Sequence, residues 1–285
     1  MGLTIHYDLS AKTRSAAKAL KMVEALRQRC LDLPFKTVGE IVDLAGTQCD
    51  ADKRDKEDPL RWFLIQCHTY VDYVWKRKYD KRGNPVMRAV KPGPNDSSRY
   101  SMGVLPLRVI GFTAWPGEGC EESNVGLCLY PATVEVDHYG YKDTVRVGAK
   151  GWSWHSFCKT QYANDPAAGG LANFLRCHLT VCAMLEAARS IGFDVEVSDE
   201  GGYWQNRDAK ALGVQVGEWD KMIAGFGGAM KDALGGSAMG LETAMDGRTD
   251  AEALEAHAPA GTAEKARQLA ELVKALAPAL KGNAE

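Results

Sequence analysis

Residues 171–197 read LANFLRCHLTVCAMLEAARSIGFDVEV, and this stretch decides the fold. Apolar side chains recur every three or four positions from Leu171 to Ile191, which predicts a long helix. Gly192 is typical of the residue that ends a helix. Asp194 to Val197 has the composition of a short strand, and Trp152 to Phe157 predicts another strand upstream of the helix. This half of the chain therefore predicts a strand, a long helix and a second strand.

The same order occurs nearer the N-terminus, where a short strand from Leu3 to Leu9 is followed by an amphipathic helix from Ser15 to Leu33. Pro34 stops that helix. The two units, led by His6 and by His155, fit duplicated ferredoxin-like halves, although the ends of the two helices match only loosely. The other segments expected are strands at Thr37 to Leu44, Trp62 to Trp75, Val104 to Trp115 and Gly126 to Val136, and loops at 48–59 and 80–100.

Together these segments predict an α+β fold, with a mixed or antiparallel sheet covered by two or three helices. Residues 1–235 would form the domain, with 1–115 and 116–235 as its two halves, and a second helix would run from Asp208 to about Leu234. Residues 236–262 are rich in Gly and Ala and predict a flexible linker. Residues 263–285 predict a C-terminal amphipathic helix, whose apolar stripe must dock on its own domain, on a second copy or on a protein partner.

Composition excludes several classes of protein. The 285 residues are 45% hydrophobic and 25% charged, with a net charge of −2, so no strong positive field would attract nucleic acid or an anionic membrane. No apolar run approaches the ~20 residues that a membrane-spanning helix needs. The N-terminal residues lack the pattern of a signal peptide. Eight Cys in such a chain predict reduced thiols, and hence a cytoplasmic location.

The densest chemistry lies in residues 151–163, GWSWHSFCKTQYA, which combine aromatic rings with many polar groups. Such a segment is typical of a pocket lining. Trp152 and Trp154 would be apolar walls, His155 a proton carrier and Cys158 a candidate thiol nucleophile. Since His155 and Cys158 are three apart, a strand would place them on opposite faces, and a part-buried structural thiol is the alternative.

The turn from Pro116 to Asn124, PGEGCEESN, is a second candidate. Glu118 and Glu121 could act as acid–base groups or bind a cation, and Asn124 could contact a ligand. The spacing of the glycines matches neither phosphate-binding motif, and three glutamates would repel a phosphate. The alternative is a hairpin with solvated charges.

Two further segments carry candidate residues. His178 and Cys182 share a helical face, which is usable geometry for zinc, but they lie on an apolar stripe, where a hydrogen-bonded core histidine is the commoner role. No Cys-x-x-Cys or His-Glu-x-x-His motif is present, and no metal is predicted. The loop that begins at Asp199 offers Tyr203 and Trp204 as pocket walls, while its polar residues would equally serve as a helix cap.

Four segments, Pro116 to Glu121, Asn124 to Pro131, Gly151 to Ala163 and Asp199 to Trp204, together resemble parts of an uncharacterised bacterial protein family. The resemblance spans residues 1–235. That family has no known activity, so the resemblance implies no functional residue, substrate or cofactor.

We expect the acidic turn, the Trp/His/Cys strand and the Asp199 loop to converge on one cleft. The leading hypothesis is a cytosolic small-molecule-binding protein or enzyme with an aromatic-walled cleft that contains carboxylates and histidine. The alternative is a non-catalytic assembly or adaptor protein that binds other subunits through aromatic surfaces and the C-terminal helix. No motif identifies a cofactor or a reaction.

Overall fold

The computed structural model describes residues 3–149, 151–234, 248–268 and 270–271. Its centre is an antiparallel sheet with the strand order β12-β1-β11-β8-β7-β2, and β3 also pairs with β7. The strands of this sheet are β1 (Thr4–Ala11), β2 (Thr37–Val38), β3 (Val42–Ala45), β7 (Arg108–Trp115), β8 (Ser123–Leu129), β11 (Trp152–Lys159) and β12 (Asp194–Asp199).

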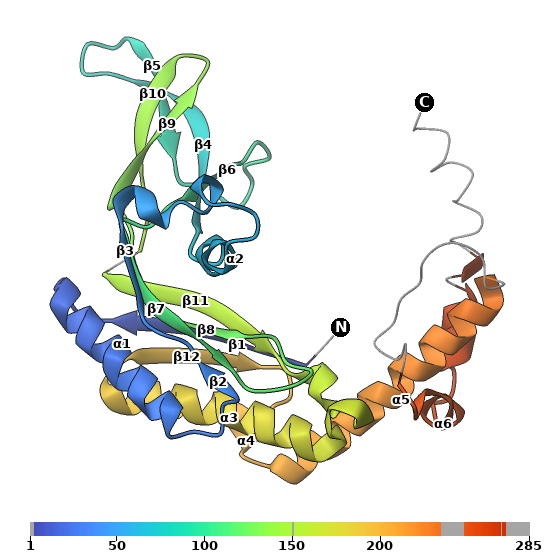
Figure 1. Cartoon of the computed structure of the whole chain (residues 1–285). Helices are drawn as coiled ribbons and strands as arrows, with labels where there is room; N and C mark the ends of the chain where they lie inside the picture. Colours follow the sequence, from blue (N-terminus) through green and yellow to red (C-terminus); the bar gives the residue numbers. More distant parts are fainter. Residues whose placement is uncertain (1–2, 150, 235–247, 269, 272–285) are drawn as a thin grey trace.

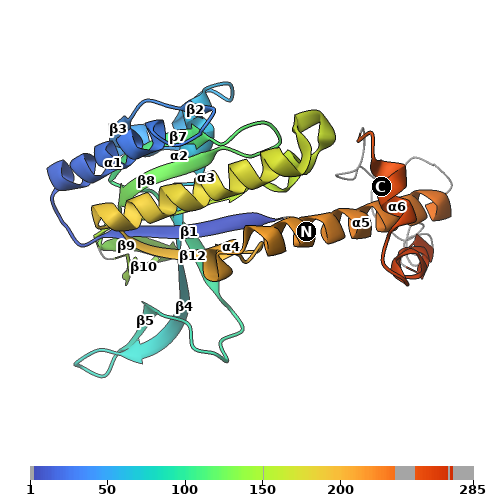
Figure 2. The same cartoon turned by 90° about the horizontal axis from the view of Figure 1, so that it is seen from below.

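Two helices, α1 (Ala16–Leu31) and α3 (Gly170–Ile191), lie side by side under one face of the sheet (Figures 1 and 2). Side chains alternate along β1, so Ile5, Tyr7 and Leu9 point into the core between sheet and helices and are at most 1% exposed. Asp8, between them, faces the other way and is exposed. We call this second face of β12, β1 and β11 the open face.

The chain builds the sheet from two interleaved units. β1 lies between β11 and β12, so β11, α3 and β12 form a split β–α–β unit around it. β11 in turn lies between β1 and β8, so β1, α1 and β8 form a second split unit, with β2 to β7 inserted between α1 and β8 along the chain. The predicted α+β class, with helices covering an antiparallel sheet, is confirmed, and Gly192 ends α3 in the left-handed conformation with φ 107°.

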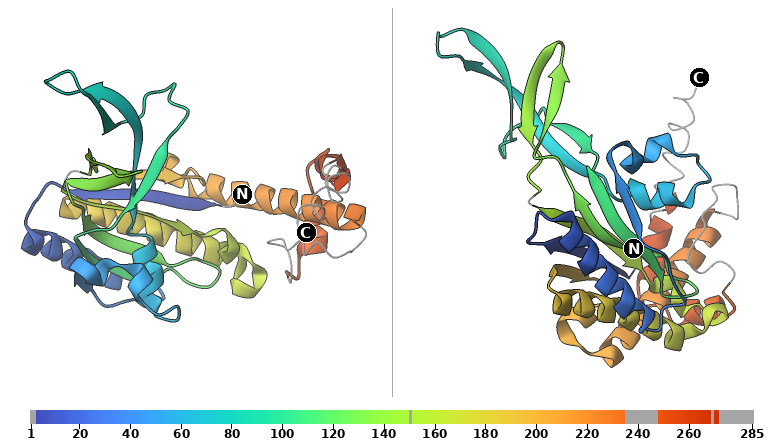
Figure 3. Two further views of the ribbon diagram at one scale, coloured as in Figure 1. Left: turned by 90° about the horizontal axis from the view of Figure 1, so that it is seen from above. Right: turned by 60° about the vertical axis from the view of Figure 1, so that its left-hand side comes forward.

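A second group of strands projects from the sheet on the side opposite α1 and α3 (Figures 1 and 3). We call these strands the arm. Val71, Tyr73, Val104, Val136 and Val145 form its small core. The arm consists of a three-stranded sheet and a hairpin: β4 (Thr69–Tyr79), β5 (Pro85–Val90), β6 (Tyr100–Val104), β9 (Thr133–His138) and β10 (Tyr141–Arg146).

Three expectations about the arm and the segments that lead into it were wrong. Residues 126–136 are not one strand, because β8 ends at Leu129 and β9 begins at Thr133. Residues 62–75 are not one strand, because α2 (Pro59–Ile65) precedes β4. The Asp58 carboxylate accepts a hydrogen bond from the backbone N–H of Leu60, and Pro59 occupies the first turn, which is a standard helix start. The expected loop at 80–100 contains β5, whose residues 85–90 pair with 74–79 of β4.

The long helix α5 (Ala209–Leu234) follows the short helix α4 (Tyr203–Asn206) and extends away from the sheet (Figure 2). The expected linker is only partly described: 235–247 lie outside the described residues, while 248–262 contain α6 (Ala251–Ala256), which packs on α5. Gly225 permits the close approach of the segment that follows α6, since a Cβ at this position would lie 2.2 Å from the Cβ of Ala258.

The predicted C-terminal helix is described only as far as residue 271. In that part Ala266 and Ala270 are fully buried against Ala229 and Met230 of α5. The described start of this segment therefore docks on the chain's own long helix, and the rest of the predicted stripe lies outside the described residues. The described residues also form four short 3₁₀ segments, at Gly46–Cys49, Ala51–Lys53, Gln161–Asn164 and Pro166–Ala168.

Candidate functional site

The Trp/His/Cys strand β11 divides its side chains between the two faces of the sheet. Trp152, Trp154 and Cys158 are at most 3% exposed, while the side chain of His155 is 66% exposed on the open face. The strand therefore does not present all of these groups to one pocket. His155 and Cys158 lie on opposite faces, as their spacing predicts.

Trp154 fills a place where two strands separate. β11 and β8 pair at only two positions, Trp152 with Leu129 and Ser153 with Cys128. After Ser153 the two strands no longer pair through their backbones. There the Trp154 indole N–H (2.9 Å) and the Tyr7 hydroxyl (2.7 Å) both donate to the backbone carbonyl of Asn124. Trp154 also packs against Phe63 of α2, with ring centroids 5.3 Å apart.

The amide of Asn124 is held in the same network. It donates to Gln66 Oε1 at 3.0 Å and accepts from the Thr113 hydroxyl at 2.7 Å, and Ser156 also donates to Gln66. Asn124 is 6% exposed. Both polar groups of its side chain are therefore already hydrogen-bonded within the fold, which is a structural role and not the predicted ligand contact.

A cavity of about 340 Å³ opens between the open face and the base of the arm. We call it the cleft. Its floor comes from β1, β11 and β12, and its roof from the segment that joins α2 to β4 and from the end of β8. The lining residues are Asp8, Leu9, Ser10, Gln66, His68, Thr69, Tyr130, Ser153, Trp154, His155, Asp194 and Glu196.

An imidazole–carboxylate pair lies on the floor of the cleft. Asp8 is paired with His155 on one side and with Glu196 on the other in the sheet register. His155 Nδ1 is 2.9 Å from Asp8 Oδ1. A carboxylate there selects the tautomer with hydrogen on Nδ1, which leaves Nε2 free to accept a proton from a ligand.

The electrostatics of the cleft favour positive charge. Three carboxylates line it, from Asp8, Asp194 and Glu196, while no Lys or Arg is among the described residues of the lining. The side chain of Lys12, 4.0 Å from Asp194, is 91% exposed. A larger hollow of about 860 Å³ adjoins Tyr130, and the described residues that line it include Lys12 and Arg14 but no carboxylate or histidine. It lacks the acid–base groups, so the cleft is the stronger candidate site.

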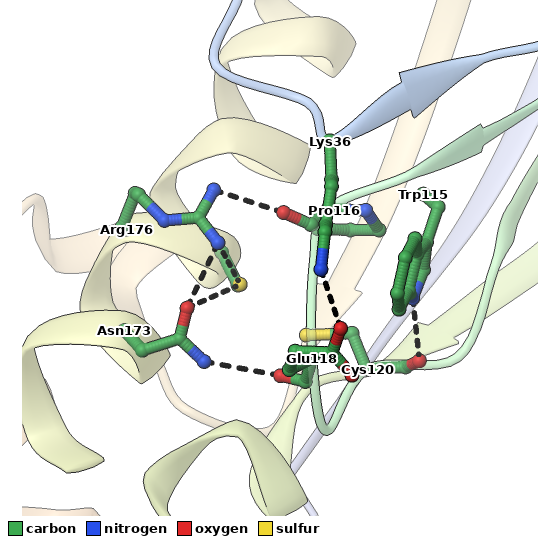
Figure 4. Close-up of polar contacts among 8 residues, drawn as sticks. Lys36, Trp115, Pro116, Glu118, Cys120, Asn173 and Arg176 are labelled. Carbon is green, nitrogen blue, oxygen red and sulfur yellow. Dashed lines mark hydrogen bonds and ion pairs between the residues drawn. The ribbon is translucent and has the colours of Figure 1, made fainter. Parts of the chain in front are cut away.

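The acidic turn does not reach the cleft. Glu121 lies at the far end of β11, where its N–H donates to the carbonyl of Lys159, and Glu118 forms an ion pair with Lys36 (Figure 4). Asn173 donates to the Glu118 carbonyl at 3.0 Å, and Arg176 donates to that of Pro116 at 2.9 Å. Helix α3 thus holds the turn away from the open face.

The predicted nucleophile is a core thiol. Burial raises the pKa of Cys158 to about 12, and its S–H lies 3.2 Å from the Glu121 carbonyl. The thiol stays protonated at neutral pH and has no access to solvent, since the residue is fully buried. Cys158 therefore lacks the features of a reactive cysteine.

The Asp199 loop lies at the buried side of the sheet, next to α3. Asp199 accepts hydrogen bonds from the N–H groups of Gly201 and Trp204, both at 2.8 Å. Trp204 is 9% exposed under the guanidinium of Arg207, which lies 4.5 Å from its ring. Tyr203 packs with it against the core. The three expected segments therefore do not converge on one cleft.

Sequence reasoning missed most of the cleft residues, including Asp8, Gln66, His68, Tyr130, Asp194 and Glu196. One signal was available, because Ile5, Tyr7 and Leu9 alternate with His6, Asp8 and Ser10. That alternation marks a polar face on β1. The sequence gives no indication that this face meets His155.

No family model, curated protein or solved structure matches the chain. Among the described residues, no helix is long and apolar enough to cross a membrane. Function must therefore be argued from the cleft itself.

Proposed function

We propose that this chain is a cytosolic small-molecule-binding protein or enzyme whose cleft takes a ligand with an amine or ammonium group. The observation that carries the proposal is the Asp8–His155 pair on the floor of a 340 Å³ cavity. Trp154 and Tyr130 supply apolar wall, and Gln66 supplies an amide. The size and the mixture of apolar wall with few polar groups are typical of small-molecule sites.

The chemistry follows from charge and proton balance. Asp8, Asp194 and Glu196 attract a cation, and neutral His155 accepts a proton at Nε2 while Asp8 stabilises the imidazolium that forms. The cleft could therefore bind an ammonium group or remove a proton from a bound hydroxyl or amine. All eight cysteines are free thiols, which supports a reducing compartment.

Fragment binding tests this function. We expect small alkylammonium ions to shift the NMR signals of His155 and Ser153, and size-matched carboxylates to leave them unchanged. Asp8→Asn should weaken ammonium binding about tenfold, because one charge-assisted interaction is lost.

Asp72→Asn is the matched control, since Asp72 is an exposed aspartate on β4 outside the lining of the cleft. It removes the same charge and should leave binding unchanged. Equal binding of carboxylates, or equal loss in the Asp72 and Asp8 variants, would contradict the proposed function.

A second candidate function is assembly through the arm, and one observation favours it. Large aromatic side chains project from the arm into solvent, with Tyr139 90%, Tyr79 70% and Tyr70 68% exposed. Aromatic residues of this kind are enriched at interfaces. Sedimentation of the wild type and of Tyr79→Ser/Tyr139→Ser would test it: we expect a loss of association with unchanged ammonium binding. If the wild type and the double variant both sediment as monomers, and the variant loses no binding partner, assembly through the arm is contradicted and the cleft remains the proposed functional site.

A further inference from the structure

Three potential metal ligands from two distant segments meet in the core, on the side of the sheet opposite the cleft. His178 and Cys182 lie one turn apart on α3, and Asp199 ends β12. Their ligand atoms, one nitrogen, one sulfur and one oxygen, all lie within 4.8 Å of one another. Cys182 is 1% exposed, and the side chains of His178 and Asp199 are fully buried.

His178 and Asp199 form a buried pair whose alignment is poor for a hydrogen bond. His178 Nε2 is 3.2 Å from Asp199 Oδ1, yet this buried nitrogen has no aligned hydrogen-bond partner. A tetrahedral zinc ion with bonds of roughly 2.0–2.1 Å to nitrogen and oxygen would separate those two atoms by about 3.3 Å. The observed spacing fits two ligands of one ion.

The groups around these ligands are arranged as around known metal sites. The Thr160 hydroxyl lies 2.9 Å from His178 Nδ1, which fixes the ring and directs Nε2 toward Asp199. The carboxylate of Asp199 is oriented by the N–H groups of Gly201 and Trp204. A Cβ at Gly201 would lie 2.5 Å from Leu212 Cδ1 and 3.2 Å from both His178 Cε1 and Asp199 Oδ1, so this position beside the two ligands has no room for a side chain.

We propose that His178 Nε2, Cys182 Sγ and Asp199 Oδ1 bind one zinc ion, with water as the fourth ligand. Nitrogen and thiolate ligands favour zinc over calcium or magnesium, which prefer oxygen alone. Binding releases the proton of the Cys182 thiol, so affinity rises with pH. The ion ties α3 to the end of β12 and stabilises the fold. The inference does not rest on the function proposed for the cleft.

Metal titration of the full-length chain tests the site. After treatment with a chelator, the protein should bind one equivalent of zinc and gain thermal stability. Cobalt(II) should give the visible bands of a tetrahedral site and a near-ultraviolet band from thiolate ligation. Cys182→Ala should abolish that near-ultraviolet band and weaken zinc binding on the order of 100-fold, while Thr160→Val, which removes the hydroxyl beside His178 Nδ1 but none of the three ligands, should weaken it about tenfold.

Cys30→Ala is the matched control, because Cys30 is a fully buried cysteine of the core on α1. It should retain the zinc stoichiometry and the cobalt spectrum, which also excludes binding by exposed thiols of unfolded chain. Failure of the chelated wild type to bind one zinc, or equal binding by the Cys182 and Cys30 variants, would overturn the proposal. Neither result would bear on ammonium binding in the cleft.

Discussion

Replacement of Trp154 by alanine is expected to lower the free energy of unfolding by about 3–5 kcal/mol. The side chain is 3% exposed and fills the space that opens where β11 and β8 stop pairing. Its loss removes the contact with Phe63 and leaves a cavity that the surrounding strands cannot close. It also removes one of the two donors to the Asn124 carbonyl.

Two further variants separate these contributions. Trp154→Phe keeps most of the apolar volume and loses the N–H, so a smaller loss of about 1–2 kcal/mol is expected. Phe157→Ala on the same strand is the control: Phe157 is 36% exposed on the open face, and its change should cost less than about 1 kcal/mol. Urea denaturation measures all three. Equal losses in the Trp154 and Phe157 variants would contradict a core role for Trp154.

The sequence predicted the helices and strands that are specified by residues within the element itself. Helix α3 and its end at Gly192 follow from apolar periodicity and a C-cap, and the expected bounds of 171–191 differ by one residue from those observed. α2 was missed although Asp58 and Pro59 form a capping signal, because the aromatic and β-branched residues after it favoured a strand throughout. A short helix and a strand start cannot be separated by composition alone.

The candidate site depends on pairings that no local pattern contains. Asp8 and His155 are 147 positions apart and meet because β1 pairs with β11 in one particular register. A shift of one residue would place Tyr7 beside His155 and turn the polar face toward the core. Glu118 and Glu121 were predicted as site residues because the turn is rich in carboxylates. Where the turn lies depends on Asn173 and Arg176 of α3, which are distant in the sequence.

The metal ligands illustrate the same limit. His178 and Cys182 are neighbours by helical spacing, and the sequence identifies them as a pair. Asp199 becomes the third ligand only because β12 packs against α3. His178 and Cys182 alone favour a hydrogen-bonded core histidine over a metal site. The position of Asp199 and the poorly aligned Nε2 of His178 favour the metal site.

Replacement of Arg248 by methionine is expected to destabilise the packing of the C-terminal segment on α5 by about 3–5 kcal/mol at neutral pH. The Arg248 side chain is 4% exposed, and its guanidinium lies 3.0 Å from Asp220 and 2.9 Å from Asp250. Methionine retains much of the volume, but it leaves the Asp220 carboxylate, which is 2% exposed, buried without its cation. Hydrogen exchange of residues 209–234 and 248–256 measures the loss directly.

The pKa of Asp220 determines how the stability deficit of Arg248→Met changes with pH. Burial raises the pKa of Asp220 above the ordinary carboxyl value, although Arg248 and Asn164 oppose the shift. The folded protein therefore holds the proton of Asp220 more tightly than the unfolded chain does. As pH rises from the ordinary carboxyl range through the raised pKa, ionisation of Asp220 lowers the free energy of unfolding. Without Arg248 the pKa rises further, so the deficit of the variant should shrink as pH falls toward about 4.

Arg267→Met is the control for this experiment, because Arg267 lies in the same segment with its side chain 64% exposed and pairs only weakly, at 3.8 Å, with Glu264. A change of less than about 0.5 kcal/mol is expected. A deficit in Arg248→Met that stays constant between pH 7 and pH 4 would mean that lost packing, and not the uncompensated Asp220 charge, causes the effect. Exchange rates unchanged from the wild type would show that the ion pair does not hold the segment on α5.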